Sequence, residues 1–306
     1  MSIVLPAITA LGTAWYVELF DDITTEKTNE MYRLVSLFLS DFEATYSRFK
    51  SNSTLSKLNQ TGHLENPDTA TIELLELGQK FYRDTNGIFN MLVGKHLIAR
   101  GYDANYSFKP TLEPVDFPSP LTDLIITDTT IILQKGHLDL GGYGKGFLID
   151  RLANYLTSLG FSFFLINGGG DIYATSDHNE AVLIYLEHPS VPGTYIGTTT
   201  LKDQGFAASS THKRRWKVGD KEYSHIVDTG KPVNHESLQN STPTPQAQAD
   251  NLGIYTKAKT AVVADVWATT LLISDPREHH TTLLTDSIDF ARFDTTQNHL
   301  TKSPNF

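Results

Sequence analysis

Apolar and polar positions recur along the chain with periods that predict both strands and helices. The stretch from Thr13 to Phe20 is rich in β-forming residues and is expected to be a strand. Between Glu26 and Thr45 the apolar residues recur every three or four positions, which predicts a helix with one buried face. A second helix is expected around Thr69 to Arg83, and the turn-forming pair Asn86 and Gly87 ends it.

A glycine-rich connection between a strand and a helix is the most informative segment. The glycines of Gly141–Gly146 follow a predicted strand end and precede apolar residues on one side of a helix. Gly160 is predicted to cap that helix at its C-terminus. The run Phe161–Ile166 is expected to be a buried strand that meets a second glycine turn at Asn167–Asp171.

The remaining segments alternate between strands and polar loops. Residues 109–120 and 234–251 contain prolines and few apolar side chains, and both are predicted to be loops. A helix of small and apolar residues is expected from Ala261 to Ser274, followed by a strand and a polar tail. Further strands are predicted at 124–127, 131–133, 181–186, 194–200 and 223–227.

Composition and charge exclude several classes of function. The chain has 306 residues, of which 40% are hydrophobic, so it can bury a large core. A net charge of −10 argues against nucleic acid as a partner, and the basic cluster at 213–217 is interpreted as a solvated turn or edge strand. The absence of cysteine excludes disulfides, thiolate metal sites and a cysteine nucleophile. Because no apolar window is long enough for a membrane span and the N-terminal residues lack a basic signal region, a cytoplasmic protein without membrane contact is expected.

The first candidate for chemistry is the segment from Asp139 to Gly146. Glycines at the start of a helix let backbone N–H groups approach an anion, and Lys145 adds a mobile cation there. The segment is not a Walker loop, because Gly146 rather than Ser or Thr follows the lysine. It also lacks the third glycine of the dinucleotide fingerprint, since Phe147 stands there. A tight turn that packs a helix against a sheet remains the alternative.

The second candidate is the pair Asp265 and Thr269. These residues are four apart on a predicted helix, so their side chains lie on one face, one turn apart. A carboxylate and a hydroxyl are hard oxygen ligands, which suit magnesium. Alternatively, Asp265 lies near the helix N-terminus, where its negative charge interacts favourably with the helix dipole, and the Thr269 hydroxyl donates a hydrogen bond to a carbonyl group of its own helix.

The third candidate is the turn that presents His225 and Asp228 at the end of a predicted strand. Histidine can act as a base near neutral pH, and the aspartate can orient it or act in its place. A histidine at a strand end can equally be structural.

Together and in this order, these motifs resemble the ApbE family of FAD:protein FMN transferases. The resemblance covers roughly residues 9 to 275. Its landmarks are Leu11–Trp15, Ser47–Phe49, Leu58–Asn59, Thr85–Asn90, Asp139–Gly146, Asn167–Asp171, His225–Asp228 and Ala264–Thr269.

The resemblance implies an α+β, T-fold-like mixed α/β architecture, with two lobes that flank a flavin cleft. Residues 1–306 would form one domain, with 234–251 as an inserted loop. Asp265, Thr269 and the Gly142 carbonyl would hold Mg²⁺, with the Ala268 carbonyl nearby. The positions that match the family's FAD contacts are Leu11, Phe49, Ile88, Phe89, Asn90, Asp139, Lys145 and Ile226.

The implied reaction is magnesium-dependent transfer of FMN from FAD to a Thr or Ser hydroxyl of an acceptor flavoprotein, with release of AMP. His225 is the candidate base and Asp228 the second. Because it lacks the cysteine of exported lipoprotein relatives, the chain more closely resembles cytoplasmic members that flavinylate soluble reductases, and such a reductase is the expected acceptor. Two features depart from the family pattern: Asn90 replaces the usual Asp, and the turn after His225 is two residues shorter. FAD hydrolysis to FMN and AMP, or FAD binding without turnover, are the alternative functions.

Overall fold

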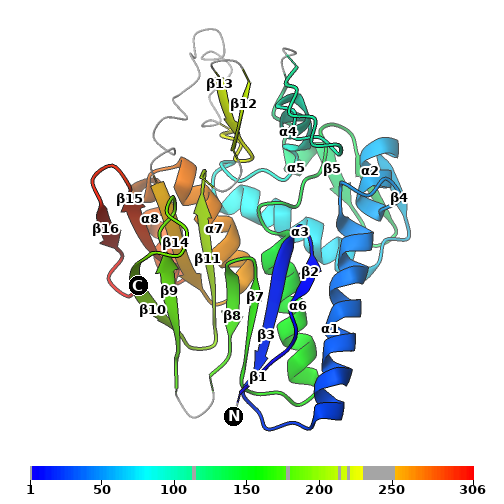
Figure 1. The fold of residues 1–306 in the computed structure, drawn as a ribbon. Coiled ribbons are helices and arrows are strands. Elements are labelled where there is room, and N and C mark those ends of the chain that lie inside the picture. The colour runs from blue at the N-terminus through cyan, green and yellow to red at the C-terminus, as the bar shows by residue number, and fades with distance from the viewer. Residues whose placement is uncertain (1, 112–114, 177–179, 213–214, 219–220, 230–251) are drawn as a thin grey trace.

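The computed structural model describes residues 2–111, 115–176, 180–212, 215–218, 221–229 and 252–306 (Figure 1). The helices are α1 (Thr25–Tyr46), α2 (Thr54–Thr61), α3 (Thr69–Asp84), α4 (Gly94–Ala99), α5 (Pro120–Asp123), α6 (Gly144–Ser158), α7 (Ala261–Ile273) and α8 (His280–Thr285), with a 3-10 turn η2 at Pro276–His279. The strands are β1 (Ile3–Val4), β2 (Ile8–Ala10), β3 (Thr13–Leu19), β4 (His63–Glu65), β5 (Leu124–Ile126), β6 (Thr130–Leu133), β7 (Phe164–Gly168), β8 (Asp171–Ala174), β9 (Val182–Glu187), β10 (Tyr195–Leu201), β11 (Gln204–Ser210), β12 (Arg215–Val218), β13 (Lys221–Ser224), β14 (Leu252–Ala258), β15 (Asp289–Asp294) and β16 (His299–Lys302).

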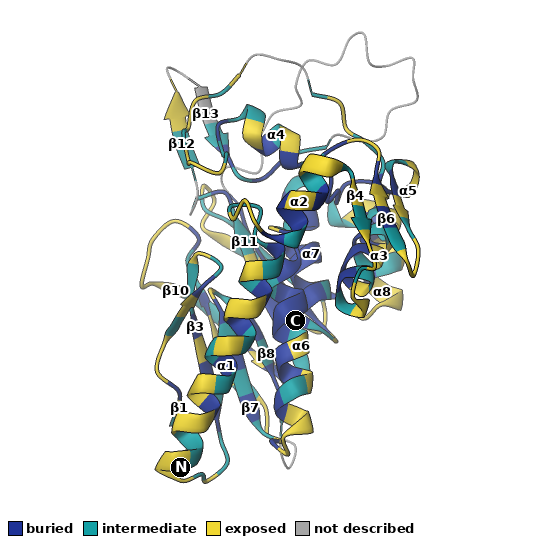
Figure 2. Ribbon diagram, turned by 90° about the vertical axis from the view of Figure 1, so that its right-hand side faces the viewer, coloured by how far each residue is buried: buried dark blue, intermediate teal, exposed yellow. Residues whose placement is uncertain are grey.

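A nine-stranded antiparallel sheet forms the centre of the molecule. Its strand order is β1-β3-β7-β8-β11-β14-β15-β16, and β2 pairs with β3. Helices α1, α6 and α7 lie on one side of this sheet (Figures 1 and 2). The mixed α/β fold expected from the sequence is therefore confirmed. No helix in the described part of the chain combines the length and apolarity needed to cross a membrane.

The side chains of β11 show how the sheet separates two apolar layers. Ala207 belongs to the cluster under α7, whereas its neighbour Phe206 belongs to a cluster on the opposite face. The opposite face is covered by the separate two-stranded ribbon of β9 and β10, whose Ile184 and Leu186 pack against it. The sheet is thus the middle of three layers.

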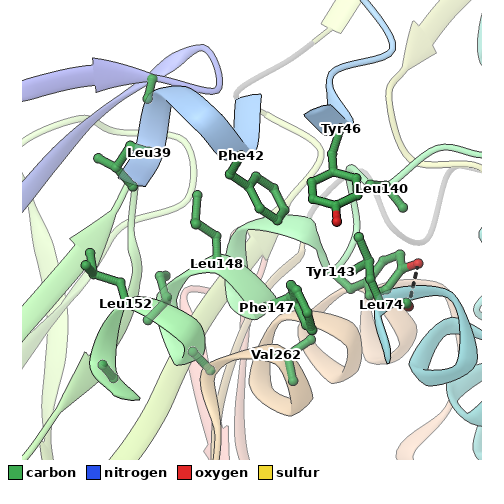
Figure 3. Close-up of a cluster of buried hydrophobic side chains, with 14 of the residues drawn as sticks. Leu39, Phe42, Tyr46, Leu74, Leu140, Tyr143, Phe147, Leu148, Leu152 and Val262 are labelled. Atoms are coloured by element: carbon green, nitrogen blue, oxygen red, sulfur yellow. Dashed lines mark hydrogen bonds between the residues drawn. The ribbon is translucent and has the colours of Figure 1, made fainter. Parts of the chain in front are cut away.

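The largest apolar cluster joins α1, α3 and α6 (Figure 3). Leu39, Phe42 and Tyr46 on α1 face Phe147 and Leu148 on α6 in this close-up. These residues recur at the helical spacing that predicted α1, and burial of their apolar area stabilises the contact.

The second part of the molecule stands beyond one end of the central sheet (Figure 1). It contains the three-stranded sheet β4-β6-β5, the helices α2 to α5 and the hairpin β12–β13. The side-chain amide of Asn59 joins α2 to the chain before the glycine turn. It accepts a hydrogen bond from the Leu138 N–H at 2.7 Å and donates to the Leu138 carbonyl at 3.0 Å.

The predicted elements with clear periodicity are present, and several expectations need correction. The strand predicted at 223–227 is wrong beyond Ser224, because β13 ends there and His225 lies in a bend. The strand end predicted before the glycine turn is also wrong, because His137 forms only an isolated bridge with Val93 and residues 138–140 are not in a strand. The elements that were not predicted are β1, β2, β4, β8, β11, β12, β14, α2, α4, α5 and α8. The polar tail contains β16, which pairs with β15. The expected loop at 234–251 lies outside the described residues.

Helices α6 and α7 approach so closely that a side chain at one position between them would not fit. A Cβ atom on Gly146 would lie 2.5 Å from the Val262 Cα and 2.7 Å from the Ala261 carbonyl oxygen. Gly205 on β11 meets the same end of α7, where a Cβ atom would lie 2.3 Å from the Ala261 nitrogen. The N-terminal turn of α7 is therefore enclosed by backbone on two sides.

Two carboxylates, the half-buried Asp150 and the buried Asp265, connect the same helices in opposite directions. Asp150 on α6 accepts hydrogen bonds from the Ala261 N–H at 2.8 Å and the Val262 N–H at 2.9 Å. Asp265 on α7 accepts from the Gly146 N–H at 3.2 Å. Each helix thus supplies an acceptor for N–H groups in the first turn of the other, where a helix has no internal partners for them.

Gly146→Ala is expected to destabilise the protein by about 1–3 kcal/mol, because the new methyl group would press on backbone atoms that cannot rotate away. Urea unfolding measures the difference. Gly197→Ala is the control, since its Cβ would make an ordinary contact of 3.5 Å with Leu300 Cδ2. Equal stability losses in the two variants would contradict the assigned close approach.

Asp150→Asn is expected to change the pH dependence of stability. Burial raises the pKa of Asp150 from its ordinary 3.8 to about 7, despite two backbone hydrogen bonds that lower it. A pKa that is higher in the folded state means that the folded protein binds the proton more tightly. The contribution of Asp150 to stability therefore falls as pH rises from about 4 to 7. The stability advantage of the parent protein over the variant should shrink across this window and stay constant above it.

Urea unfolding at a series of pH values tests this expectation. Asp286→Asn, at an exposed position after α8, serves as the matched control and should run parallel to the parent protein at every pH. A difference between the parent protein and Asp150→Asn that does not vary with pH would refute the assignment.

Candidate functional site

A cavity of about 1510 Å³ lies where the central sheet meets the second part of the molecule. Its walls come from the end of α1, the turns β2–β3 and β7–β8, the glycine turn before α6, strand β11, helix α7 and the segment after β13. Most of these contributors are turns or ends of elements, which is typical of ligand sites on a rigid scaffold.

All but two of the site residues predicted from the sequence line this cavity. The exceptions are Asp228 and Ala268. Ala268 is fully buried in the apolar cluster between α7 and the sheet, and Asp228 acts electrostatically on Arg100. The residues brought together are Leu11, Phe49, Ile88, Phe89, Asn90, Asp139, Gly142, Lys145, His225, Ile226, Asp265 and Thr269.

The glycine turn is held by its own first residue. Asp139 forms an ion pair with Arg48 and accepts a hydrogen bond from the Gly141 N–H at 2.8 Å. Arg48 in turn lies over the ring of Phe49, 4.2 Å from its centroid, and donates to the Tyr102 carbonyl at 3.0 Å. The Asp139 carboxylate is therefore already paired and orders the turn.

The N–H groups expected to face an anion are largely engaged within the protein. Besides the bond from Gly141 to Asp139, the Gly144 N–H donates to the Leu140 carbonyl at 2.6 Å. The Gly146 N–H donates to Asp265. The interpretation of the glycine turn as a cradle of free N–H groups is corrected accordingly, and Lys145 remains as the cation of this turn that lines the cavity.

Oxygen atoms suited to a divalent cation gather on α7 and β11. Asp265 and Thr269 both line the cavity, and the Thr269 Oγ1 lies 3.4 Å from the Ser209 Oγ. Gly142 lines the same cavity, and a Cβ atom there would lie 3.1 Å from the Phe89 ring. Carboxylate, hydroxyl and carbonyl oxygens are the donors that Mg²⁺ prefers.

The electrostatics of Asp265 also fit a cation. Burial raises the pKa of this carboxyl group, while Lys145 and the Gly146 N–H act to lower it. Among the described residues no group of three or more His, Cys, Asp or Glu side chains is arranged so that it could hold a metal ion. A metal ion here would therefore depend on hydroxyl and carbonyl oxygens besides Asp265, which matches a hard ion such as Mg²⁺.

Lys145 lies between two buried carboxylates. It forms an ion pair with Asp171, the first residue of β8, and its Nζ lies 4.0 Å from the Asp265 Oδ2. The side chains of Asp171 and Asp265 are only 4% and 6% exposed, so their charges need a nearby cation.

The side-chain amide of Asn90 forms its hydrogen bonds with backbone groups of the protein. Its Nδ2 donates to the Pro118 carbonyl at 2.8 Å, and its Oδ1 accepts from the Leu92 N–H at 2.8 Å. An ionised aspartate could accept from Leu92 but could not donate to Pro118. The amide at this position therefore fits the surrounding backbone.

The segment that carries His225 is anchored to the second part of the molecule. The Ile226 carbonyl accepts a hydrogen bond from Arg100 at 2.7 Å. The Thr229 hydroxyl donates to the Gly87 and Ile88 carbonyls at 3.1 and 3.0 Å. Burial lowers the pKa of Arg100, and the charge of Asp228 opposes that effect. Asp228 thus contributes to holding the segment, and His225 lines the cavity.

An aromatic group forms part of the cavity wall. It consists of Phe49, Tyr102, Tyr106, Phe108 and Trp216. The rings of Phe49 and Tyr106 are stacked, with centroids 5.0 Å apart, and those of Tyr102 and Trp216 are stacked at 5.7 Å. Tyr106 and Phe108 both have a φ of 50°, a strained conformation for non-glycine residues that is common at functional sites.

Sequence reasoning gave no role to several residues of this site. Arg48 and Asp171 stood inside recognised landmarks, and their charges next to Phe49 and the second glycine turn were a usable signal. Ser209 and the members of the aromatic group other than Phe49 gave no signal, because strand pairing and loop geometry bring them to the cavity.

Similar proteins were found by sequence and by structure. Residues 11–289 match the model of the ApbE family. The FAD:protein FMN transferase of Haemophilus influenzae is 26% identical over 255 residues, which cover 74% of this chain and 71% of the relative. The enzyme of the same name from Escherichia coli K12 is 22% identical over 292 residues, covering 88% and 77%.

Solved structures share the fold. The ApbE protein of Thermotoga maritima superposes with a TM-score of 0.80 at 18% identity, covering 99% of this chain and 97% of that one. The apo form of the Pseudomonas stutzeri flavinyl transferase ApbE gives 0.76 at 18% identity, covering 100% and 95%. Because the family model matches residues 11–289, which are most of the sequence, this chain belongs to the ApbE family.

Proposed function

We propose that this protein transfers FMN from FAD to a Thr or Ser hydroxyl of an acceptor flavoprotein, with magnesium as cofactor and AMP as the second product. The observation that carries the proposal is the convergence of Lys145, Asp265 and Thr269 with the aromatic group on one cavity. Curated relatives that bear the name FAD:protein FMN transferase support it. The acceptor, in the cytoplasm, would be a soluble reductase.

The size of the cavity supports a large substrate. Its volume of about 1510 Å³ exceeds the roughly 300–1,000 Å³ of ordinary small-molecule pockets. A dinucleotide with two ring systems would occupy the aromatic group and the glycine turn, and the remaining volume would admit an acceptor side chain.

Different residues of the cavity would bind the metal ion, the diphosphate and the ring systems of FAD. Asp265, Thr269 and the Gly142 carbonyl would hold Mg²⁺, which when bound supplies positive charge to the diphosphate and orients it. Lys145, whose Nζ lies 4.0 Å from the Asp265 Oδ2, would provide a second positive charge. The aromatic group would hold the ring systems, so that the bond to be broken is fixed in place.

The transfer step exchanges one phosphorus–oxygen bond for another. The acceptor hydroxyl oxygen forms a bond to the FMN-side phosphorus, and the bond from that phosphorus to the bridging oxygen breaks, so that AMP leaves with that oxygen. A hydroxyl group is a weak nucleophile at neutral pH, so the reaction needs a base that takes up its proton. His225 would accept this proton. Asp228 is the less suitable base, since its charge acts on the buried Arg100.

Asp265→Asn is expected to reduce FMN transfer by about 10²–10³-fold, because the cation loses its one charged ligand. The assay incubates the protein with FAD, Mg²⁺ and a purified acceptor carrying the target hydroxyl. A fluorescent band that survives denaturation reports FMN transfer, and AMP is measured in parallel. Asp286→Asn should retain full activity as the control for loss of a carboxylate.

The same assay separates the possible functions. AMP release at the full rate without an acceptor would identify FAD hydrolysis instead of transfer. Tight FAD binding with neither AMP nor covalent flavin would identify a binding protein and reject the proposed reaction.

His225→Ala and Asp228→Asn are expected to have different effects. The His225 variant should lose about 10²–10⁴-fold in transfer rate with unchanged FAD affinity, as expected for a general base. The Asp228 variant should mainly lower the thermal midpoint, because Arg100 loses a compensating charge. Transfer rates and thermal unfolding of both variants test this, and a reversed pattern would assign the base to Asp228.

A further inference from the structure

The ion pair between Lys145 and Asp171 bears on how a cation enters this site. Lys145 is the second residue of α6, Asp171 begins β8 and Asp265 lies on α7, so three separate elements supply the charges. The Lys145 side chain is 23% exposed, and the two carboxylates are almost fully buried. The ammonium group is paired with Asp171 and stands 4.0 Å from Asp265.

The charges of this triad do not balance. Two carboxylates face one ammonium group, and the Gly146 N–H is a further but uncharged donor to Asp265. An unpaired carboxylate in a buried position is unfavourable, so a second cation is stabilised there. The position of Lys145 decides which of the two carboxylates is left for that cation.

We propose that Asp171 is a positioning residue that holds the Lys145 ammonium group away from Asp265, and thereby leaves the Asp265 carboxylate free for a divalent cation. This inference rests on the proposed function, because the role of Asp265 in holding the metal is part of that proposal. Lys145 is then the resident cation of the metal-free site and a competitor for Asp265 whenever Asp171 is lost.

The inference predicts opposite effects of two substitutions on the affinity for a divalent cation. In Asp171→Asn the ammonium group keeps Asp265 as its one remaining charged partner in the triad, so it opposes the entry of a divalent cation. In Lys145→Gln both carboxylates lose their ammonium partner, so a divalent cation should bind more tightly, although FAD should bind more weakly. A residue that merely supports the fold would not produce this reversal.

The experiment titrates the full-length, FAD-free protein with Mn²⁺ and measures free Mn²⁺ by electron paramagnetic resonance. Asp171→Asn should weaken Mn²⁺ binding about tenfold or more, and Lys145→Gln should strengthen it several-fold relative to the parent protein. In the double variant the loss should disappear, because there is no ammonium group left to compete.

Glu43→Gln is the matched control. Glu43 also lines the cavity and also pairs with a lysine, its Oε2 lying 3.1 Å from the Lys50 Nζ. Its loss should leave the Mn²⁺ affinity unchanged. Thermal unfolding of each variant verifies that it is folded, and Lys145→Gln tests the competition by the ammonium group independently of Asp171→Asn.

Three outcomes would overturn the inference. Parent-like Mn²⁺ binding by Asp171→Asn would remove any role for Asp171. A double variant as weak as Asp171→Asn would make Asp171 a direct ligand of the cation. Unchanged or weaker binding by Lys145→Gln would show that the lysine does not compete. In each of these cases the parent protein still binds Mn²⁺, whereas a parent protein that binds none would reject the metal site of the proposed function as well.

Discussion

The backbone contact between the start of α6 and the start of α7 is the constraint on which the rest of the site depends. Gly146 and Gly205 leave room for the first turn of α7 to lie against α6 and β11. Asp150 and Asp265 then satisfy N–H groups across the contact. Because α6 carries Lys145 and α7 carries Asp265, helix packing fixes the backbone positions of these two residues, and the ion pair with Asp171 fixes the ammonium group between the two carboxylates.

The same packing places aspartate carboxylates in positions that are largely removed from solvent. Asp171 and Asp265 are buried and Asp150 is half-buried near the meeting point of two helices and a strand, and each has an N–H group or an ammonium group within reach. Such carboxylates contribute little to net stability, since desolvation offsets their attraction to a partner. Asp171 and Asp265 line the cavity and fit the cation site proposed above, whereas Asp150 accepts hydrogen bonds from the first turn of α7.

The sequence predicted the parts of the fold whose pattern is local. Helix α1 follows from its apolar spacing, and α7 follows from its small and apolar residues, since it is buried on nearly all sides (Figure 2). Strand β11 was missed because residues such as Ala207 and Ser209 have no strong strand signal and depend on pairing partners far along the chain. Strand β14 was overlooked although it contains Ile254, Tyr255 and Thr256, which favour strands. Except for Asp228 and Ala268, the site residues on landmarks line one cavity, whereas Ser209 and the members of the aromatic group other than Phe49 depend on contacts that no local pattern reveals.

Asn90 illustrates how a departure from a family pattern can be absorbed. Its amide joins the Leu92 N–H to the Pro118 carbonyl, so it closes the loop that carries Ile88 and Phe89 to the cavity wall. A carboxylate would leave the Pro118 carbonyl without this donor and would add a negative charge to a cavity already lined by Asp139, Asp171 and Asp265. The neutral side chain is therefore compatible with binding of an anionic dinucleotide, since it removes repulsion while preserving the shape of the wall.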